Sequence, residues 1–406
     1  MTGTRLRAAY AAYPRPFWML VVGTFVNRTG LVVLPFLALY LHGQRGFSVA
    51  QATLAVSLYG AGSFVGGFTG GWVSDRIGRR PVLLASLAGA AVPVALLPAA
   101  PTYAAIAALA FAFGLLAEMY RPAVSAAVAD MLPEERQPRA YAIVYWAINL
   151  GAAVGPALGG LIAARSYAGL FWLEGATLLG YAAIVLVAVP ETRPLSDESA
   201  ARTLSLRPLA RDGALAALAV AVLLVGIGFF QLFSSLPITM AADGLNELEF
   251  GLVVTVNGGL IVLIGLPVAA YVGDRLTTVL VPGAVALVAI GLALTATAET
   301  FWAYAAFAVI WTLGEMAFLP VVPTIVSRLA PAHLRGSYQG VYHASWGLSK
   351  TVGPALGGLV LTAAGSEELW LGAGGLAGVA AVVLLGLLPV LRRRFATAPA
   401  STSVPA

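Results

Sequence analysis

The sequence predicts an all-α membrane protein built from twelve transmembrane helices in two pseudo-symmetric halves of six. Three observations predict this fold class: the composition, the recurrence of long apolar stretches, and a repeat of the first half in the second. Of the 406 residues, 60% are hydrophobic and 10% are charged, and the mean hydropathy is +0.89. A soluble globular protein has roughly 45–50% apolar and about 25% charged residues. Most of the chain is therefore expected to lie in lipid.

The apolar stretches are long enough to cross a bilayer, which takes about 20 residues for a hydrocarbon core of about 30 Å. The first stretch continues to Tyr40 without a small-residue cleavage site, so it is interpreted as a membrane helix and not as a signal peptide. Six spans are expected in the first half, over residues 16–41, 50–72, 81–99, 103–129, 140–164 and 169–189. Six are expected in the second half, over residues 213–240, 250–271, 278–297, 302–327, 337–362 and 368–391.

The basic residues predict the orientation. With the amino terminus inside, 18 of the 23 Lys and Arg residues lie on the cytoplasmic side, Arg45 and Arg165 lie outside, and Arg28, Arg121 and Lys350 lie within spans. Cytoplasmic loops of membrane proteins carry an excess of Lys and Arg. We therefore expect a multi-pass protein of the cell (inner, cytoplasmic) membrane with both termini in the cytoplasm. The scattered charges form no basic face, which argues against a nucleic-acid partner.

The two halves are related by an internal repeat. Residues 130–162 align without a gap on residues 328–360, at an offset of 198, and the string GPALGGL occurs in both. A polar segment rich in Ser, Arg and Pro separates the halves. The predicted organisation is an amino-terminal six-helix bundle over residues 1–190, a cytoplasmic central loop over 191–212, and a carboxy-terminal bundle with a short cytoplasmic tail over 213–406. Such duplicated units place a substrate site between the halves, near mid-membrane.

A charged loop follows the second span. It reads GGWVSDRIGRRPVLL and resembles the loop motif G-x-x-x-D-R-x-G-R-R of the major facilitator superfamily. The resemblance extends to the span count, the central loop and the duplication, and so covers the whole chain. It implies that the loop is a latch that holds one state of an alternating-access cycle. The residues that match are Gly71, Asp75, Arg76, Gly78, Arg79 and Arg80, with Asp274 and Arg275 retained in the second half.

The fifth span contains NLGAAVGPALGG, which resembles the motif that marks antiporters in this superfamily. Gly151, Gly155 and Gly159 recur every four residues and give a smooth helix face for close packing, and Pro156 removes a backbone hydrogen bond. The eleventh span repeats GPALGG, so shared packing of the two halves is the alternative interpretation. The motif favours antiport over symport.

Polar residues occur in the middle of several spans. A charge at the bilayer centre costs about 2.5–3.5 kcal/mol on insertion scales, so such groups are candidates for function. The resemblance implies that the first, fourth, seventh and tenth helices line the central cavity, and each has such a group. The expected substrate-binding residues are Arg28, Tyr120, Arg121, Gln231, Trp311 and Lys350, with Phe229, Phe230 and Phe233 as apolar neighbours.

Two carboxylates are candidates for proton coupling. Glu315 is favoured as the proton carrier because no basic residue lies within one helical turn of it, and burial favours the neutral form of an unpaired carboxylate. Glu118 is the second candidate, since Arg121 is three residues away and on the same helix face. Lys350, the only lysine of the chain, is expected to pair with Glu315 on the adjacent helix, and Arg28 is a possible partner of Glu118 across helices.

Other chemistries lack their residues. The chain has no cysteine and three scattered histidines, so no metal site is expected, and Lys350-Thr351 lacks the glycines of a phosphate-binding loop. No nucleophile and base are arranged in the spans, so the protein is expected not to be an enzyme and to need no cofactor other than a proton gradient. Glu174, beside Phe171 and Trp172, is interpreted as a residue of the outer interface.

The function expected from these residues is proton-coupled export of a small amphipathic organic solute, a drug or a metabolite, by a monomeric antiporter that alternates between two states. The central set contains three cations and two carboxylates, so proton-coupled uptake of a small organic anion or nutrient is the alternative. A transporter-fold sensor that no longer transports is a further alternative. The retained loop motif and mid-span charges argue against it.

Overall fold

The computed structural model describes residues 13–133, 136–193, 211–274, 277–331 and 334–396, and this part of the chain is helical throughout. The amino-terminal half is made of α2 (Arg15–Thr29), α3 (Val33–Leu39), η1 (Tyr40–Gln44), α4 (Val49–Ile77), α5 (Arg79–Leu96), η2 (Leu97–Ala99), α6 (Tyr103–Met131), α7 (Gln137–Ala163) and α8 (Tyr167–Ala188). The carboxy-terminal half is made of α10 (Gly213–Phe229), η4 (Phe230–Phe233), α11 (Leu236–Ala242), α12 (Glu247–Asp274), α13 (Thr277–Leu294), η5 (Thr295–Thr297), α14 (Phe301–Phe318), α15 (Val322–Leu329), α16 (Arg335–Ala363) and α17 (Ser366–Ala396).

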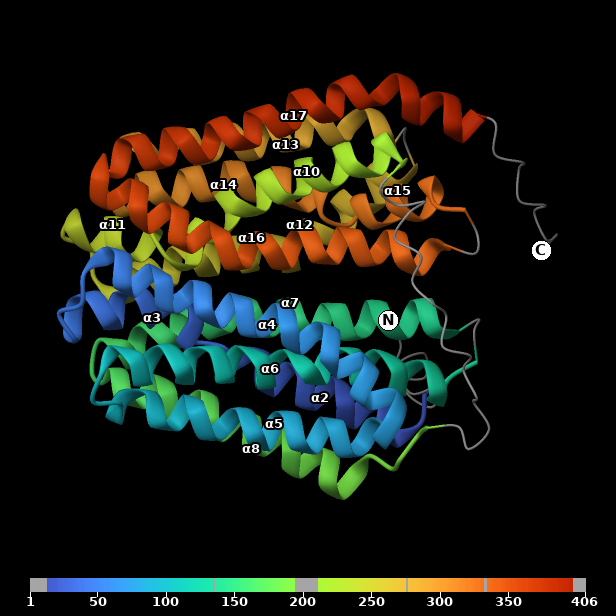
Figure 1. Ribbon diagram of the computed structural model, residues 1–406, viewed down its shortest axis with the longest axis horizontal. Coiled ribbons are helices and arrows are strands. Elements are labelled where there is room, and N and C mark those ends of the chain that lie inside the picture. Colours follow the sequence, from blue (N-terminus) through green and yellow to red (C-terminus); the bar gives the residue numbers. More distant parts are fainter. Residues whose placement is uncertain (1–12, 134–135, 194–210, 275–276, 332–333, 397–406) are drawn as a thin grey trace, which may run out of the picture.

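The repeat extends over both halves. α2, α4, α5, α6 and α7 begin 198 residues before α10, α12, α13, α14 and α16, and α8 begins 199 residues before α17. The offset found in one conserved string of the sequence is therefore the offset of the whole architecture. Figure 1 shows the two halves as stacked bundles with nearly parallel helices. We call the end with Arg76, Arg79, Arg136 and Arg392 the basic end and the opposite end the far end.

Eleven helical segments among the described residues are long and apolar enough to cross a membrane. They correspond to all the expected spans except the eleventh. That span forms α16, a single helix of 29 residues that lies in the bundle beside α10 and α4 (Figure 1). Its many polar residues, among them Gln339, His343, Ser349 and Lys350, make it less hydrophobic than the others.

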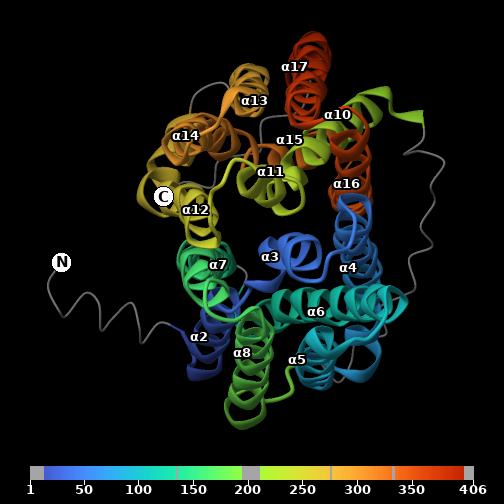
Figure 2. The same ribbon diagram turned by 90° about the vertical axis from the view of Figure 1, so that its left-hand side faces the viewer.

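The two halves meet along two helix pairs and at the far end. α7 packs against α12 and α4 packs against α16, while α3 contacts α11 and η4 between them (Figure 2). Small residues allow the close approach. A Cβ atom on Gly251 would lie 2.3 Å from the carbonyl oxygen of Pro156, and one on Gly60 would lie 2.3 Å from that of Lys350. The far end is thus closed by contacts between the halves.

Three of the expected spans are broken, which the apolar pattern did not predict. The first breaks at Gly30–Val32, the seventh passes through η4 before α11, and the tenth breaks at Leu319–Val321. The segment after each break has a proline in its first turn: Pro35, Pro237 or Pro323. Proline lacks an N–H and is favoured in the first turn of a helix, so each of these residues lies at the start of a new helix.

The start of α10 is held at the basic end by Asp212. Its carboxylate accepts hydrogen bonds from the backbone N–H groups of Ala214 (3.0 Å) and Leu215 (3.3 Å), from the hydroxyl of Tyr338 (2.8 Å) and from Arg394 (2.7 Å). Burial alone would raise the pKa of Asp212, but the hydrogen bonds from Arg394, Tyr338 and Leu215 outweigh it and the pKa is lowered. One carboxylate therefore connects α10, α16 and α17.

Candidate functional site

Glu118 is the centre of an ion-pair cluster in the middle of the bundle. One carboxylate oxygen, Oε1, lies 3.1 Å from Nζ of Lys350, and the other, Oε2, lies 3.1 Å from Nη1 of Arg121. Lys350 also donates to the hydroxyl of Ser63 at 3.1 Å, and its Nζ lies 4.7 Å from the centre of the Tyr59 ring. The expected pairing of Lys350 with Glu315 is therefore wrong.

This cluster joins the two halves of the protein. Glu118 and Ser63 belong to α6 and α4 of the amino-terminal half, and Lys350 belongs to α16 of the carboxy-terminal half. The side chains of Glu118 and Lys350 are 14% and 15% exposed, whereas that of Arg121 is 50% exposed. The pair is thus shielded from solvent, while Arg121 remains accessible to a solute.

Arg28 lies on α2, next to the break, and has no carboxylate partner among the described residues. Its Nη2 donates to the hydroxyl of Tyr120 at 3.0 Å, and that hydroxyl donates to Oδ1 of Asn27 at 3.0 Å. The side chain is buried, and its Nε has no hydrogen-bond partner in the described structure. Arg28 does not pair with Glu118, so it contributes a positive charge and an unsatisfied donor.

Glu315 is in a different environment. It is buried in α14, its Oε2 accepts a hydrogen bond of 2.7 Å from the side-chain amide of Asn257, and no cation of the described residues pairs with it. The same amide donates to the hydroxyl of Thr312 at 3.0 Å. Asn257 was missed in the sequence, although a polar residue in the middle of the span 250–271 was the signal that would have identified it.

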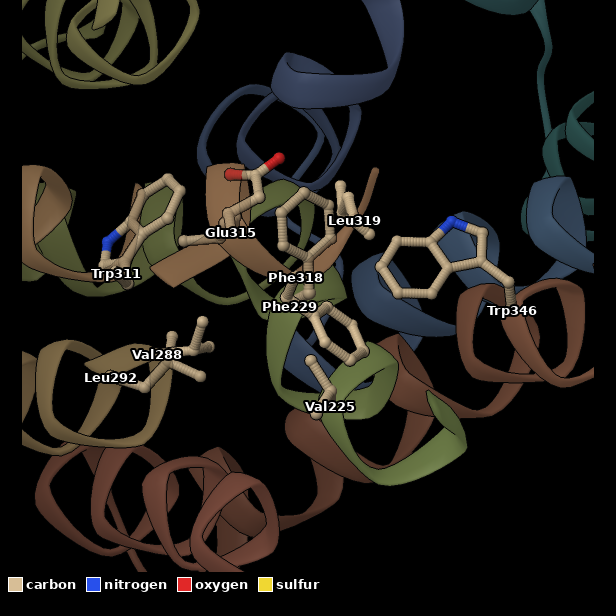
Figure 3. Close-up of a pocket in the computed structure, with 10 residues that line it drawn as sticks. Val225, Phe229, Val288, Leu292, Trp311, Glu315, Phe318, Leu319 and Trp346 are labelled. Atoms are coloured by element: carbon tan, nitrogen blue, oxygen red, sulfur yellow. The ribbon is translucent and has the colours of Figure 1, made fainter. Parts of the chain in front are cut away.

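A small pocket in the carboxy-terminal half has Glu315 as its only ionisable lining residue (Figure 3). Side chains from α10, α13, α14 and α16 meet there, and Glu315 lines the pocket together with the rings of Trp311, Phe229 and Phe318. The ring of Phe229 lies 5.5 Å from that of Trp346 and 6.5 Å from that of Trp311, centre to centre. The lining consists of Val225, Phe229, Leu232, Val288, Leu292, Trp311, Glu315, Phe318, Leu319 and Trp346.

Gln231 is buried where α10 passes into η4, and protein groups occupy its amide. Its Nε2 donates to the carbonyl oxygens of Ile227 at 2.9 Å and Gly353 at 2.7 Å, and its Oε1 accepts from the hydroxyl of Ser235 at 2.8 Å. These bonds attach the break in the seventh span to α16. In this structure the side-chain amide of Gln231 is thus hydrogen-bonded to protein groups of the carboxy-terminal half and not exposed to a solute.

The charged loop after α4 forms a network at the basic end. Arg79 donates to Asp75 at 2.9 Å and to Asp130 at 3.0 Å, and Arg80 donates to the carbonyl oxygen of Leu186 at 2.7 Å. These bonds connect α4, α5, α6 and α8, all in the amino-terminal half. The guanidinium of Arg76 lies 3.7 Å from the centre of the Trp72 ring.

Two glycines of this loop have different roles. Gly78 has φ +103°, which favours glycine, and a Cβ there would lie 2.4 Å from the carboxylate of Glu191. Gly71 was expected to allow close approach of a helix, but a Cβ at Gly71 would meet Pro122 at an ordinary 3.7 Å. Gly70 makes that approach instead, because its Cβ would lie 2.5 Å from the carbonyl oxygen of Met119.

Glu191 holds the start of α5. Its carboxylate accepts backbone hydrogen bonds from Arg79 (2.9 Å), Arg80 (3.2 Å), Thr192 (2.9 Å) and Arg193 (2.8 Å). Burial would raise the pKa of Glu191, but these N–H donors lower it below the ordinary value.

In the second half, Asp274 is the last residue of α12, and Arg275 lies outside the described residues.

The glycines of the fifth span face the broken first span. A Cβ on Gly151 would lie 2.5 Å from Cβ of Arg28, one on Gly155 would lie 3.0 Å from the carbonyl oxygen of Thr29, and one on Gly159 would lie 2.8 Å from the Phe36 ring. The smooth face of α7 is thus applied to α2 and α3 on both sides of the break. Pro156 instead lies against Gly251 of α12, in the other half.

Comparison with known proteins gives a consistent family. The family described as the Major Facilitator Superfamily matches residues 20–240 and 218–405. The chain is 29% identical over 363 residues to the uncharacterized MFS-type transporter YttB of Bacillus subtilis (strain 168), covering 88% of this chain and 91% of that protein.

Two further similarities are informative. The chain is 23% identical to a Na(+), Li(+), K(+)/H(+) antiporter of Planococcus maritimus, over 81% of this chain and 85% of that protein. Among solved structures, the peptide transporter POT in complex with sulfate superposes with a TM-score of 0.75 at 16% identity, over 95% of this chain and 98% of that chain. At this identity the likeness shows a shared fold.

Proposed function

The chain belongs to the major facilitator superfamily and is a membrane transporter, not an enzyme, and on that premise we propose that it exports a small amphipathic organic solute in exchange for protons. We place it in the cytoplasmic membrane as a monomer with both termini inside. Solute and protons would be its partners, and the proton gradient would drive each cycle by alternating access.

The observation that carries this proposal is the contrast between the two buried carboxylates. Glu118 lies between Lys350 and Arg121, so its charge is compensated in place. Glu315 accepts a hydrogen bond from an amide and shares its pocket with aromatic rings, but it pairs with no cation of the described residues. Burial of a carboxylate without a cation costs less free energy in the neutral form than in the charged form. Glu315 is therefore suited to take up and release a proton.

The lining of the same pocket has the chemistry that such a solute needs, and in this state the pocket has room for only about one water molecule. The aromatic rings around Glu315 offer apolar surface, and a ring face attracts a positive charge. An amphipathic solute with a cationic group and a proton would then compete for one carboxylate. Such competition produces antiport, since the carboxylate binds either the solute or a proton but not both at once. The antiporter of Planococcus maritimus, which exchanges cations for protons by its name, supports this mode of coupling.

One observation favours the alternative of proton-coupled uptake of an organic anion. Arg121 is half exposed, and Nε of the buried Arg28 lacks a partner in the described structure. Arg121 is accessible to a carboxylate, whereas Arg28 would have to be uncovered before it could bind one. Arg121→Ala should then weaken binding of anionic solutes more than that of neutral ones, whereas a uniform loss would indicate that Arg121 acts through Glu118.

The test is transport by the purified protein in vesicles with an imposed pH difference, over a panel of cationic, neutral and anionic solutes. Glu315→Gln mimics the protonated carboxyl with little change in size. We expect it to abolish gradient-driven accumulation and to retain binding. Glu299→Gln, at an exposed position of the far end, is the matched control. If Glu315→Gln still concentrates solute from a pH difference, Glu315 is not the proton carrier.

A further inference from the structure

Glu174 is a third carboxylate within the spans, and the transport proposal does not use it. The sequence placed it at the outer interface, but its side chain is inside the bundle and only 2% of the residue is exposed. It lies on α8, two turns from the start of the helix. Its Oε2 accepts a hydrogen bond of 2.7 Å from the backbone N–H of Val33, and it also interacts with the backbone N–H of Val32. Among the described residues no cation pairs with it.

These N–H groups belong to the break in the first span. Val33 is the first residue of α3, and its N–H has no acceptor within that helix. α8 also contacts the other side of the break. A Cβ on Gly30, which ends α2, would lie 2.0 Å from the hydroxyl oxygen of Thr177, one turn after Glu174. α8 therefore holds both edges of the break, and Glu174 is the titratable group in that contact.

The segment that Glu174 holds closes the far end. α3 packs against α11 and η4 of the opposite half, as Figure 2 shows from that end. Phe36, one turn after Val33, has its ring 5.1 Å from that of Phe250 on α12. The position of α3 thus contributes to the contact of the halves at the far end, beside the hydrogen bond of 3.0 Å from Tyr167 of α8 to Glu247 of α12, and Glu174 anchors the start of α3.

We propose that Glu174 is a second proton-binding site, and that its charge determines whether the far end of the protein is closed. An ionised carboxylate accepts a hydrogen bond about twice as strong as a neutral acceptor does, so the anion holds α3 firmly. Proton uptake removes the charge and weakens the hydrogen bond to Val33. α3 is then released, and the contacts of α3 with the opposite half separate more readily.

The surroundings support titration at this position. Arg28 of α2 and Tyr59 of α4 interact electrostatically with Glu174. α5 packs against α8 but has its charged residues, Arg79 and Arg80, at the basic end. On α3 and η1 the titratable side chains are Tyr40 and His42, toward the far end, and on α7 they are Arg139, Tyr141 and Tyr145, toward the basic end. The proton therefore binds without displacing a direct salt bridge.

The proposal goes beyond the exchange assigned to Glu315 and requires only that the protein alternates between two states. It is tested by measuring the far end directly. The chain has no cysteine, so Gln44→Cys and Ala242→Cys, at exposed positions of opposite halves, carry the only two labels. The distance between two spin labels is measured in lipid as pH is varied. For the otherwise unchanged protein we expect the ratio of short to long distances to fall about fivefold to tenfold at acidic pH, the difference between a charge-assisted and a neutral hydrogen bond.

Glu174→Gln should show the long distance over the whole pH range. The exposed control Glu299→Gln should keep the full pH response. The distance is measured without solute and without an imposed pH difference, which separates this proposal from the one on proton coupling. If Glu174→Gln does not fold, Glu174→Asp replaces it, since the shorter carboxylate still titrates but loses contact with Val33 and should show a smaller response. A distance independent of pH in the labelled parent protein overturns the proposal, as does an unchanged pH response in whichever of the two variants folds.

Discussion

Lys350→Gln tests the connection between the two halves most directly. Lys350 is the only residue of the carboxy-terminal half that forms an ion pair with the amino-terminal half among the described residues. Its Nζ lies 3.1 Å from Glu118, and both side chains are about six-sevenths buried, at 15% and 14% exposed. Removal of one partner of a buried pair costs about 3–5 kcal/mol, because a charge is left without compensation.

The expected loss is smaller here, because Arg121 stays 3.1 Å from the other oxygen of Glu118. We expect Lys350→Gln to destabilise the state that contains the pair by about 1–3 kcal/mol. This corresponds to a change of roughly 5- to 150-fold in the ratio of that state to the alternate state. The structure contains the pair in the state whose far end is closed. If the pair is absent from the other state, Lys350→Gln shifts the protein toward that other state by this factor.

The assay is the ratio of short to long distances between labels at Gln44→Cys and Ala242→Cys, combined with a double-mutant cycle. Lys350→Gln, Glu118→Gln and the double variant are measured at one pH, with Lys350→Arg as the control that keeps the positive charge. The coupling between the two positions should exceed about 1 kcal/mol, since distant sites add to within about 0.5 kcal/mol. Additive effects, or an unchanged ratio in Lys350→Gln, would refute the reasoning.

Three further predictions concern packing, capping and the charged loop. Gly151→Ala places a Cβ 2.5 Å from Arg28, so we expect a loss of about 1–3 kcal/mol in stability and weaker solute binding, while Gly259→Ala, which meets nothing within 4 Å, should change neither by a measurable amount. Asp212→Asn should lower stability by about 1–2 kcal/mol at neutral pH, and the difference in melting temperature from the parent should vanish at strongly acidic pH. The reason is that the pKa of Asp212 is lower in the folded protein than in the unfolded chain. Its carboxylate therefore stabilises the fold at pH values above the unfolded pKa, and this stabilisation is lost as the pH falls through the folded pKa. Asp75→Asn should leave insertion and solute binding intact, because Asp75 is 65% exposed, but should slow turnover in vesicles, and an unchanged rate would exclude a role as latch.

The fold was predictable because its signals are local. Hydropathy locates a span without knowledge of its neighbours, and the offset of 198 at GPALGGL applies to every helix pair to within one residue. The breaks were missed because they depend on two helices at once. The helix that contains Pro35 starts where Glu174 of α8 accepts a hydrogen bond from the N–H of Val33 and Thr177 of α8 packs against Gly30.

The site was predictable in its residues but not in its pairs. A charge in the middle of a span identifies Glu118, Glu315 and Lys350 from composition alone. Which of them meet depends on how α16 lies against α6 and α4, and this is set by small residues such as Gly60 at the contact. Asn257 was missed because it lies in the eighth span, whereas the resemblance implies that the first, fourth, seventh and tenth helices line the cavity.

The repeat of 198 residues gives the two halves the same order of helices but not the same charges. Glu118 and Arg121 of the first half are matched by Met316 and Leu319 of the second, and Arg28 is matched by Gly226. The first half thus contributes Arg28, Glu118 and Arg121, and the second half contributes Glu315 and Lys350 at other positions of the repeat. Because the pattern of charge differs between the two sides, we expect a dipolar solute to bind in one orientation.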